Sequence, residues 1–274
     1  VLTAVKHANG KDWWLINPLL YENGYVRFLL DSNGFSEPMY QYDIGRDWDP
    51  NGNYGCAAQF TPDGKKYIRW NSDDGTFIYR FDRETGLLSD FQWLDNRIDT
   101  SFLVFAGMAV SPNSRFLYLS SLVDLYQYDL EADDILSSAV KVGSWDPNVR
   151  YRPNIWAGQL GPDCRIYFTT TSSSEKIHVV HQPDLKGSSC DFRYHSFPFH
   201  RSGGGSIPHY PNYRLDSGPV CDPGIVITGT WNIPEVQGAL RELIRLGKEQ
   251  EFISLDDINQ ALPPDFGDIE IIEE

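Results

Sequence analysis

The sequence predicts an all-β fold, a β-propeller, complete or partial, with a short C-terminal α-helical appendage. The first observation is a phrase that occurs three times, at residues 60–70, 110–120 and 160–170, with its proline at 62, 112 and 162. Each copy places a Pro-Asp or Pro-Asn turn between apolar stretches, which is typical of strand, tight turn and strand. The second is a strand-like stretch after each copy, at 77–82, 125–130 and 177–182. Repeated units of three or four strands indicate propeller blades, of which about four or five are recognisable.

The blades follow one another along the chain. Residues 2–16 look like two strands across the Asn9-Gly10 turn, and 25–38 complete a first blade that lacks the Pro-Asp turn. The repeats place a second blade through residues 70–86, a third at 105–142 and a fourth at 155–192. Blades are scaffolds, so we expect any specificity to lie in the loops that connect their strands.

The charge is concentrated near the C-terminus. The formal net charge is −15, and from Asn232 onward there are eleven acidic and three basic residues. This shift in composition near Thr230 predicts a propeller over residues 1–230 and an acidic helical tail over 231–274. The net charge argues against nucleic-acid backbones and anionic membranes as direct partners.

No stretch reaches the apolar length of a membrane span, and Val1 leads directly into strand-like sequence, as in a processed or truncated chain.

The tail has the pattern of two short helices. Pro234 suits a first helical position, and a helical spacing of apolar residues follows it as far as Gly247. Ser254 can cap a second helix that begins with two acidic residues and ends before Pro263.

The four cysteines, Cys56, Cys164, Cys190 and Cys221, show no metal-binding spacing. Cys164 holds the turn position that Gly64 holds in its sister repeat, and we interpret it as a tolerated substitution. A bridge between Cys190 and Cys221 is an alternative if the protein is exported.

A weak calcium-loop pattern follows the first blade. Asp47, Asp49 and Asn51, followed by Gly52, match the opening of such a loop. The pattern then fails, because Ala58 stands where a glutamate ligand is needed. The alternative is an Asx-rich loop between strands, and similar residues recur at 144–148. Calcium is therefore the one cofactor that the sequence suggests.

Candidate catalytic residues do not stand out. The chain has no Gly-x-Ser-x-Gly and no phosphate-binding glycine loop with Lys-Ser/Thr. His178 and His181 are three apart on a strand, so they are expected on opposite faces. A metal-binding cluster of His195, His200 and His209 is an alternative that the spacing of these residues neither requires nor excludes. Seven tryptophans could line a glycan- or peptide-binding face or pack between blades: Trp13, Trp14, Trp48, Trp70, Trp93, Trp145 and Trp156.

Two phrases carry a resemblance to a known family. Residues 7–14, His-Ala-Asn-Gly-Lys-Asp-Trp-Trp, precede the Pro-Asp-Gly-Lys repeat and resemble the propeller region of large secreted surface proteins of gliding bacteria. Residues 189–213, with a glycine-rich loop and Pro211-Asn-Tyr, are similar to that family's closing blade. The resemblance covers roughly residues 2–222 and implies a propeller that precedes adhesive repeats and a type IX secretion signal. Family members normally carry further blades before the first phrase, and the family supplies no catalytic residues.

The tail carries a second resemblance. Residues 240–265, with the Gly-Lys-Glu-Gln and Ala-Leu-Pro phrases, resemble the acidic N-terminal region of bacterial primary sigma factors. In that family the region is a small helical module that mimics nucleic acid and occupies the DNA channel of RNA polymerase. A fusion or a joined gene would account for both halves, and an unrelated acidic helical hairpin is the alternative.

Three functions follow as hypotheses. The favoured one is a non-catalytic secreted or cell-surface scaffold that binds a protein or glycan ligand through its blade loops. The second is a propeller enzyme, a glycan lyase or hydrolase that uses central carboxylates or histidines. The third is a module that binds RNA polymerase through its tail, which would place the protein in the cytoplasm.

Overall fold

The computed structural model describes residues 2–19, 22–46, 57–71, 74–97, 107–121, 123–146, 148, 154–170, 174–203, 210–225 and 245. The chain divides into two compact units, Val1–Pro198 with Ser202–Val226, and Phe199–Arg201 with Ile227–Glu274. The predicted tail helices lie outside the described residues except for Arg245, which is helical. No helix among these residues is long and apolar enough to cross a membrane.

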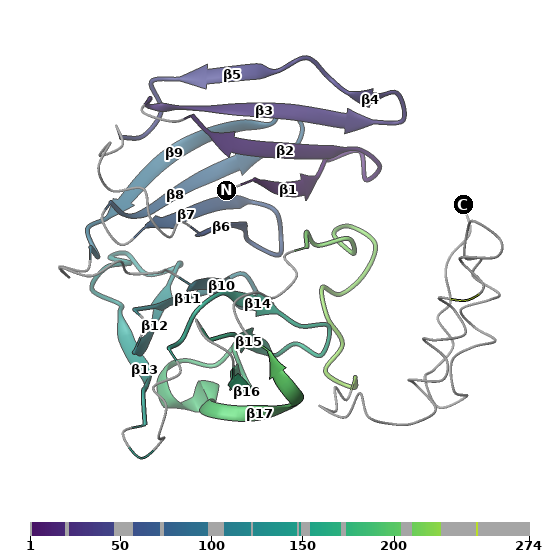
Figure 1. Ribbon diagram of the computed structural model, residues 1–274. Helices are drawn as coiled ribbons and strands as arrows, with labels where there is room; N and C mark the ends of the chain where they lie inside the picture. The colour runs from purple at the N-terminus through teal and green to yellow at the C-terminus, as the bar shows by residue number, and fades with distance from the viewer. Residues whose placement is uncertain are drawn as a thin grey trace. The chain divides into compact units, whose positions relative to one another are not determined.

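Four antiparallel sheets make up the first unit (Figure 1). The first blade contains β1 (Thr3–Lys6), β2 (Trp13–Pro18), β3 (Gly24–Asp31), β4 (Gly34–Phe35) and β5 (Met39–Tyr42). The second contains β6 (Ala57–Phe60), β7 (Lys66–Asn71), β8 (Gly75–Asp82) and β9 (Leu87–Leu94). The third contains β10 (Gly107–Val110), β11 (Phe116–Ser120), β12 (Asp124–Asp129) and β13 (Val140–Ser144). The fourth contains β14 (Gly158–Leu160), β15 (Ile166–Phe168), β16 (Ser174–Val180), the 3-10 helix η1 (Gly187–Cys190) and β17 (Phe192–Gly203).

The sheets are arranged as propeller blades. Strands pair in chain order within the second, third and fourth sheets, and in the first sheet β5 pairs with β3 beside β4. The first strand of each sheet contacts the first strand of the next, β1 with β6, β6 with β10 and β10 with β14. In Figure 1 these four strands lie innermost and the sheets spread outward from them. The predicted β-propeller fold is therefore confirmed.

Three apolar cores lie between neighbouring blades. Strand β11 is buried throughout, because Leu117 and Leu119 pack towards the second blade while Phe116 and Tyr118 pack towards the fourth. Strand β2 instead alternates, with Trp14, Ile16 and Pro18 buried and the residues between them half-buried. Among the described residues, only one face of the first blade packs against another blade. On its other face Trp13 contacts the ring of Tyr213, whereas Tyr40 and Tyr42 are exposed.

The repeated turns have one conformation. Gly64, Ser114 and Cys164 have φ values of 70°, 64° and 64°, in the left-handed region, and Gly10 of the first blade has 75°. In the three repeats, the amide of Gly64, Ser114 or Cys164 donates to the carbonyl of the residue that precedes the proline. Gly64, for example, donates to Thr61 at 2.8 Å. The prediction of strand, tight turn and strand is confirmed in all three copies. The first blade differs in detail, because its outermost paired strand is β5, beyond the predicted end at residue 38.

Gly64→Ala is expected to destabilise the protein more than Gly10→Ala. Both changes put a side chain on a left-handed residue, which costs about 1–2 kcal/mol. A Cβ at Gly10 meets nothing within 4 Å, whereas at Gly64 it lies 2.8 Å from Arg83 Cδ and 2.9 Å from Leu215 Cδ2. Crowding adds about 1–3 kcal/mol at Gly64. Urea unfolding of both variants measures the difference, and equal losses of stability would contradict the packing described here.

Candidate functional site

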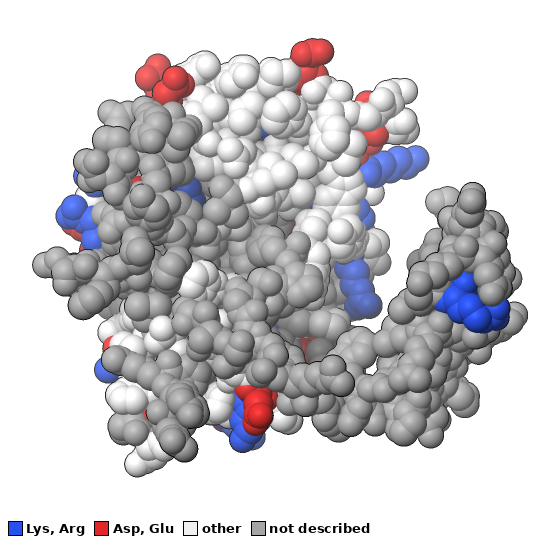
Figure 2. All heavy atoms as spheres, in the orientation of Figure 1, with Lys and Arg blue, Asp and Glu red and all other residues white. Residues whose placement is uncertain are grey.

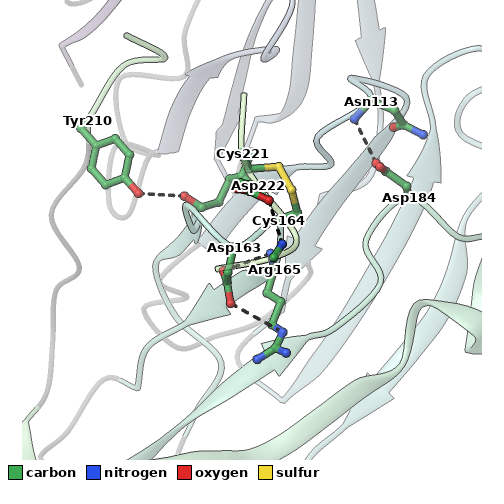
Figure 3. Close-up of a disulfide and its surroundings, with 10 residues drawn as sticks. Asn113, Asp163, Cys164, Arg165, Asp184, Tyr210, Cys221 and Asp222 are labelled. Atoms are coloured by element: carbon green, nitrogen blue, oxygen red, sulfur yellow. Dashed lines mark hydrogen bonds and ion pairs between the residues drawn. A yellow bond between two sulfur atoms is a disulfide. The ribbon is translucent and has the colours of Figure 1, made fainter. Parts of the chain in front are cut away.

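At one end of the blades, hydrogen bonds connect the turn of each blade, or the strand beside it, to the following blade. The amide of Ala8 donates to the carbonyl of Arg83 at 3.1 Å, which joins the first blade to the second. Lys66 Nζ donates to the carbonyl of Leu130 at 3.0 Å and joins the second to the third. The amide of Asn113 donates to Asp184 Oδ1 at 2.9 Å and joins the third to the fourth (Figure 3).

The turn of the fourth blade is contacted by a later segment of the chain. We call residues 210–225 the strap. The amide of Asp222 donates to the carbonyl of Pro162 at 2.7 Å, and a disulfide joins Cys164 to Cys221 (Figure 3). The hydroxyl of Tyr210 donates to the carbonyl of Leu160 at 3.0 Å. The strap thus contacts the fourth turn as a following blade contacts the first three turns.

The strap also binds the first and second blades. Lys6 Nζ donates to the carbonyls of Tyr213 and Leu215, at 3.0 and 3.3 Å. Asn212 Nδ2 donates to the carbonyl of Pro62 at 2.9 Å. The Leu215 side chain is buried in the core between the first two blades. One short segment therefore connects three blades.

Arg83 is the polar centre of this arrangement. Its guanidinium donates to the carbonyl of Lys6 at 2.8 Å, to that of His7 at 3.1 Å, and to the carboxylate of Asp216, with which it forms an ion pair. The hydrogen bond from Arg83 holds the pKa of the Asp216 carboxyl below its usual value. The carbonyl of Arg83 accepts from Trp14 Nε1 at 2.9 Å. A single side chain thus links the first blade, the second blade and the strap.

Between the strap and the innermost strands lies a cavity of about 190 Å³, which we call the axial cavity. Strands β1, β6, β10 and β14 contribute to its wall, as does the strap. The described residues that line it include no Asp, Glu or His. The hypothesis of a glycan lyase or hydrolase relies on carboxylates or histidines within hydrogen-bond reach of the substrate, so the described lining of this cavity gives it no support.

The cysteine predictions were wrong. Cys164 does occupy the left-handed turn position, but it is bonded to Cys221, and Cys190 is a buried free cysteine. Burial raises the pKa of the Cys190 thiol, so it carries little thiolate. Cys221 lies beyond the repeats in the sequence and reaches the fourth turn because the strap folds back across it. A cysteine at a turn position that prefers glycine was the signal available in the sequence.

The exposed aromatic residues are not the predicted tryptophans. Trp14 and Trp70 are buried, Trp13, Trp93, Trp145 and Trp156 are half-buried, and Trp48 lies outside the described residues. On the first blade, by contrast, the exposed fractions are 66% for Phe35, 51% for Tyr40 and 55% for Tyr42. Uncharged side chains cover much of the visible surface over this blade (Figure 2).

Tyr40 and Tyr42 lie side by side on β5. Their ring centroids are 5.9 Å apart and the ring planes differ by 10°. Gln41 between them forms two hydrogen bonds with the backbone of Leu88, at 2.8 and 3.0 Å, and so fixes β5 to the second blade. Successive side chains of a strand point to opposite faces, so both tyrosines face away from the second blade. We call this pair the tyrosine platform.

A serine and two histidines meet on the fourth blade. Ser174 Oγ is 2.9 Å from His195 Nε2 and donates to the carbonyl of Lys176 at 2.7 Å. The hydroxyl proton is therefore directed to a carbonyl, whereas a nucleophilic serine needs a base that accepts it. His178 Nδ1 accepts from the amide of His195 at 3.0 Å, and its Nε2 faces the carbonyl of Asn154 at 3.3 Å. These bonds hold His178 as a neutral ring.

Acid is expected to destabilise the protein through His178. Burial lowers the pKa of this fully buried ring from 6.5 to about 4. The unfolded chain therefore binds a proton that the folded chain does not, and stability falls as the pH drops from 6.5 towards 4. The full loss of folding free energy over this pH range is about 3 kcal/mol. Urea unfolding at several pH values checks this, and His178→Gln should remove that part of the slope. An unchanged slope in the variant would contradict it.

Most of the other predicted ligands lie outside the part of the chain that the structure describes. Asp47, Asp49, Asn51 and His209 lie outside the described residues, as does the side chain of His200. Calcium binding therefore stays a prediction. Among the residues that are described, no group of three or more His, Cys, Asp or Glu side chains could hold a metal ion.

Comparison with known protein families gives a match at the C-terminal end of the chain. Residues 235–274 match the family model for the Sigma-70 factor, region 1.1. This is the segment that resembles a sigma-factor region, and it is a small part of the chain. A comparison with curated proteins gives no match.

Several solved structures are similar. The periplasmic gluconolactonase of Pseudomonas aeruginosa is 14% identical, with a TM-score of 0.45 over 70% of this chain and 55% of that chain. The PQQ domain of pyranose dehydrogenase from Coprinopsis cinerea is 14% identical, with a TM-score of 0.44 over 64% of this chain and 44% of that chain. A protein from Lactobacillus plantarum is 13% identical, with a TM-score of 0.41 over 64% of this chain and 52% of that chain. The chain spans about half the length of each of these proteins.

Proposed function

We propose that the protein is a non-catalytic recognition scaffold of the cell surface or the secreted fraction, which binds a glycan or protein ligand through its first blade and its blade loops. The observation that carries the proposal is the tyrosine platform. Two tyrosines that are each more than half exposed, with nearly parallel rings, stand on a strand fixed by Gln41. Tyrosine offers a large rigid surface with a polar tip at low entropic cost, which suits recognition.

The disulfide supports the proposed compartment. Structural disulfides persist in oxidising compartments and are rare in the cytosol. The resemblance of residues 2–222 to propellers of secreted proteins of gliding bacteria favours the same placement, with export by type IX secretion as its more specific form. Under this proposal Cys164–Cys221 keeps the strap on the blades outside the cell.

A double variant tests the platform. Tyr40→Ser with Tyr42→Ser is expected to abolish binding to the ligand that a glycan microarray or a panel of purified surface polymers identifies with the full chain. Leu136→Ser, which changes a 39% exposed apolar residue on the third blade, is the matched control and should bind normally. Undiminished binding by the folded double variant would refute the role of the platform.

The tail supports a second candidate function. Because residues 235–274 match Sigma-70 region 1.1, binding to core RNA polymerase is the alternative. Pull-down with purified core enzyme, using the full chain and a chain that lacks residues 232–274, separates the two proposals. Tail-dependent binding would favour the polymerase, and its absence would remove this candidate.

A further inference from the structure

An aromatic row runs along the outer edge of the first blade. It consists of Phe35 on β4 with Tyr40 and Tyr42 on β5, each more than half exposed. Their partners on β3 are an even number of positions apart, so the three side chains lie on one face of the sheet. These partners extend from Gly24 to Leu30, about 20 Å along the strand. A row of this length suits an extended ligand better than a compact one.

Three exposed carboxylates flank β5. Glu37 precedes the strand and Asp43 follows it. The amide of Asp43 donates to the carbonyl of Asn23 at 2.8 Å, which brings the neighbouring Glu22 to the same end of the strand. Among the described residues, no lysine or arginine forms an ion pair with these three carboxylates. Acidic side chains are visible along this outer edge in Figure 2. The aromatic row therefore has negative charge at both ends of β5.

The basic residues nearest to β5 in its sheet and in the sequence are directed elsewhere. Arg27 on β3 pairs with Met39, so it lies on the opposite face of the blade from Tyr40. Arg46 is the next basic residue after β5, and its guanidinium carbon lies 4.2 Å from the centre of the Trp93 ring. A binding partner would therefore have to bring the positive charge that complements the carboxylates.

The tyrosines and the carboxylates favour the same kind of ligand. The face of a tyrosine ring attracts an ammonium or guanidinium ion. The centroids of Tyr40 and Tyr42 are 5.9 Å apart, and alternate side chains of an extended peptide are about 7 Å apart on one face. A neutral glycan would leave the carboxylates without a partner, and an anionic glycan would be repelled by them. These observations favour a basic stretch of polypeptide.

We propose that the tyrosine platform binds an extended basic segment of a partner protein, whose lysine or arginine side chains at alternate positions stack on the rings of Tyr40 and Tyr42. The carboxylates of Glu37, Asp43 and Glu22 pair with the basic groups of the segment. This ligand class rests on the proposed recognition role of the platform and belongs to the same site.

A triple variant of the full chain removes the negative charge, Glu22→Gln, Glu37→Gln and Asp43→Asn. Asparagine tolerates the left-handed backbone at Asp43, where φ is 55°. The matched control makes the same change of charge at exposed acidic residues of the other blades, Glu84→Gln, Asp133→Asn and Glu175→Gln. Circular dichroism and thermal unfolding verify that both variants fold. The double variant Tyr40→Ser with Tyr42→Ser removes the rings and keeps the charge.

The probe is a fluorescent hexapeptide of alternating serine and arginine. In the control peptide each arginine is replaced by citrulline, which has nearly the same shape and no charge. Fluorescence anisotropy should show saturable binding of the arginine peptide, with weaker binding at higher salt and about tenfold or more weaker binding of the citrulline peptide. The affinity should fall about tenfold in the triple charge variant and in the tyrosine double variant. The matched control variant should bind as the unchanged protein does.

Absence of saturable binding of the arginine peptide would overturn the basic-segment proposal, and so would equal affinities of the triple charge variant and its matched control. A glycan whose binding needs both tyrosines and is unaffected by the triple charge variant would also overturn it, while the recognition role of the platform would stand. If the tyrosine double variant bound every ligand as the unchanged protein does, both proposals would fail.

Discussion

Replacing both Cys164 and Cys221 by serine is expected to lower the free energy of unfolding by roughly 4 kcal/mol. The two cysteines are 57 residues apart, and the bridge restricts the unfolded chain over that length. Without the bridge the strap is held to the fourth blade by the hydrogen bonds of Tyr210 and Asp222. We expect its other end to stay bound through Arg83 and Lys6.

Urea unfolding of the double variant measures this loss. The unchanged protein treated with reductant should lose a similar amount, and the double variant should not respond to reductant at all. Both cysteines are replaced together so that neither is left to pair with Cys56 or Cys190. Intact-mass analysis after alkylation without reduction should find Cys164 and Cys221 protected. Alkylation of both in the native protein would contradict the bridge.

Arg83→Ala is expected to cost about 2–3 kcal/mol of stability. The substitution leaves the carbonyls of Lys6 and His7 without their donor and removes the ion pair to Asp216. The side chain of Arg83 is only 16% exposed, so water replaces these bonds incompletely. Arg83→Lys should recover part of the loss, because an ammonium group cannot reproduce the planar fork of donors.

Arg193→Ala is the matched control. Arg193 also forms a two-pronged ion pair, with Asp191, but its side chain is 58% exposed. Exposed pairs contribute about 0–1 kcal/mol, so this variant should be nearly as stable as the unchanged protein. Equal losses from Arg83→Ala and Arg193→Ala, measured by urea unfolding, would show that Arg83 does not join the strap to the blades.

The blades could be predicted from the repeats because the sequence pattern of strand, turn and strand lies within one short stretch of the chain. The proline at 62, 112 and 162 fixes one turn position, and the residues on either side alternate as strands do. The predicted strands at 77–82 and 125–130 correspond to β8 and β12 within one or two residues. The boundary near Thr230 stays a prediction, as do the tail helices and the calcium loop.

The strap could not be predicted because its contacts join distant residues. Nothing in the local pattern at 210–225 indicates that Asn212 reaches Pro62 or that Asp216 meets Arg83. The tyrosine platform was missed for another reason. Tyr40 and Tyr42 alternate with Met39 and Gln41 as in any half-buried strand, and the sequence does not tell which pair is exposed. The same applies to Arg69, a charged residue that is 1% exposed on β7.

We infer that the four blades and the strap together form a stably folded domain. Limited proteolysis with intact-mass readout, run with and without reductant, tests this claim most directly. We predict a resistant fragment that extends from the first blade to about residue 225 or 230 without reductant, with the acidic tail trimmed. With reductant, new cleavage should begin near Cys221 while the blades stay intact. Cleavage between blades in the unreduced protein would contradict the account, because the four blades would then not be stable with the strap alone.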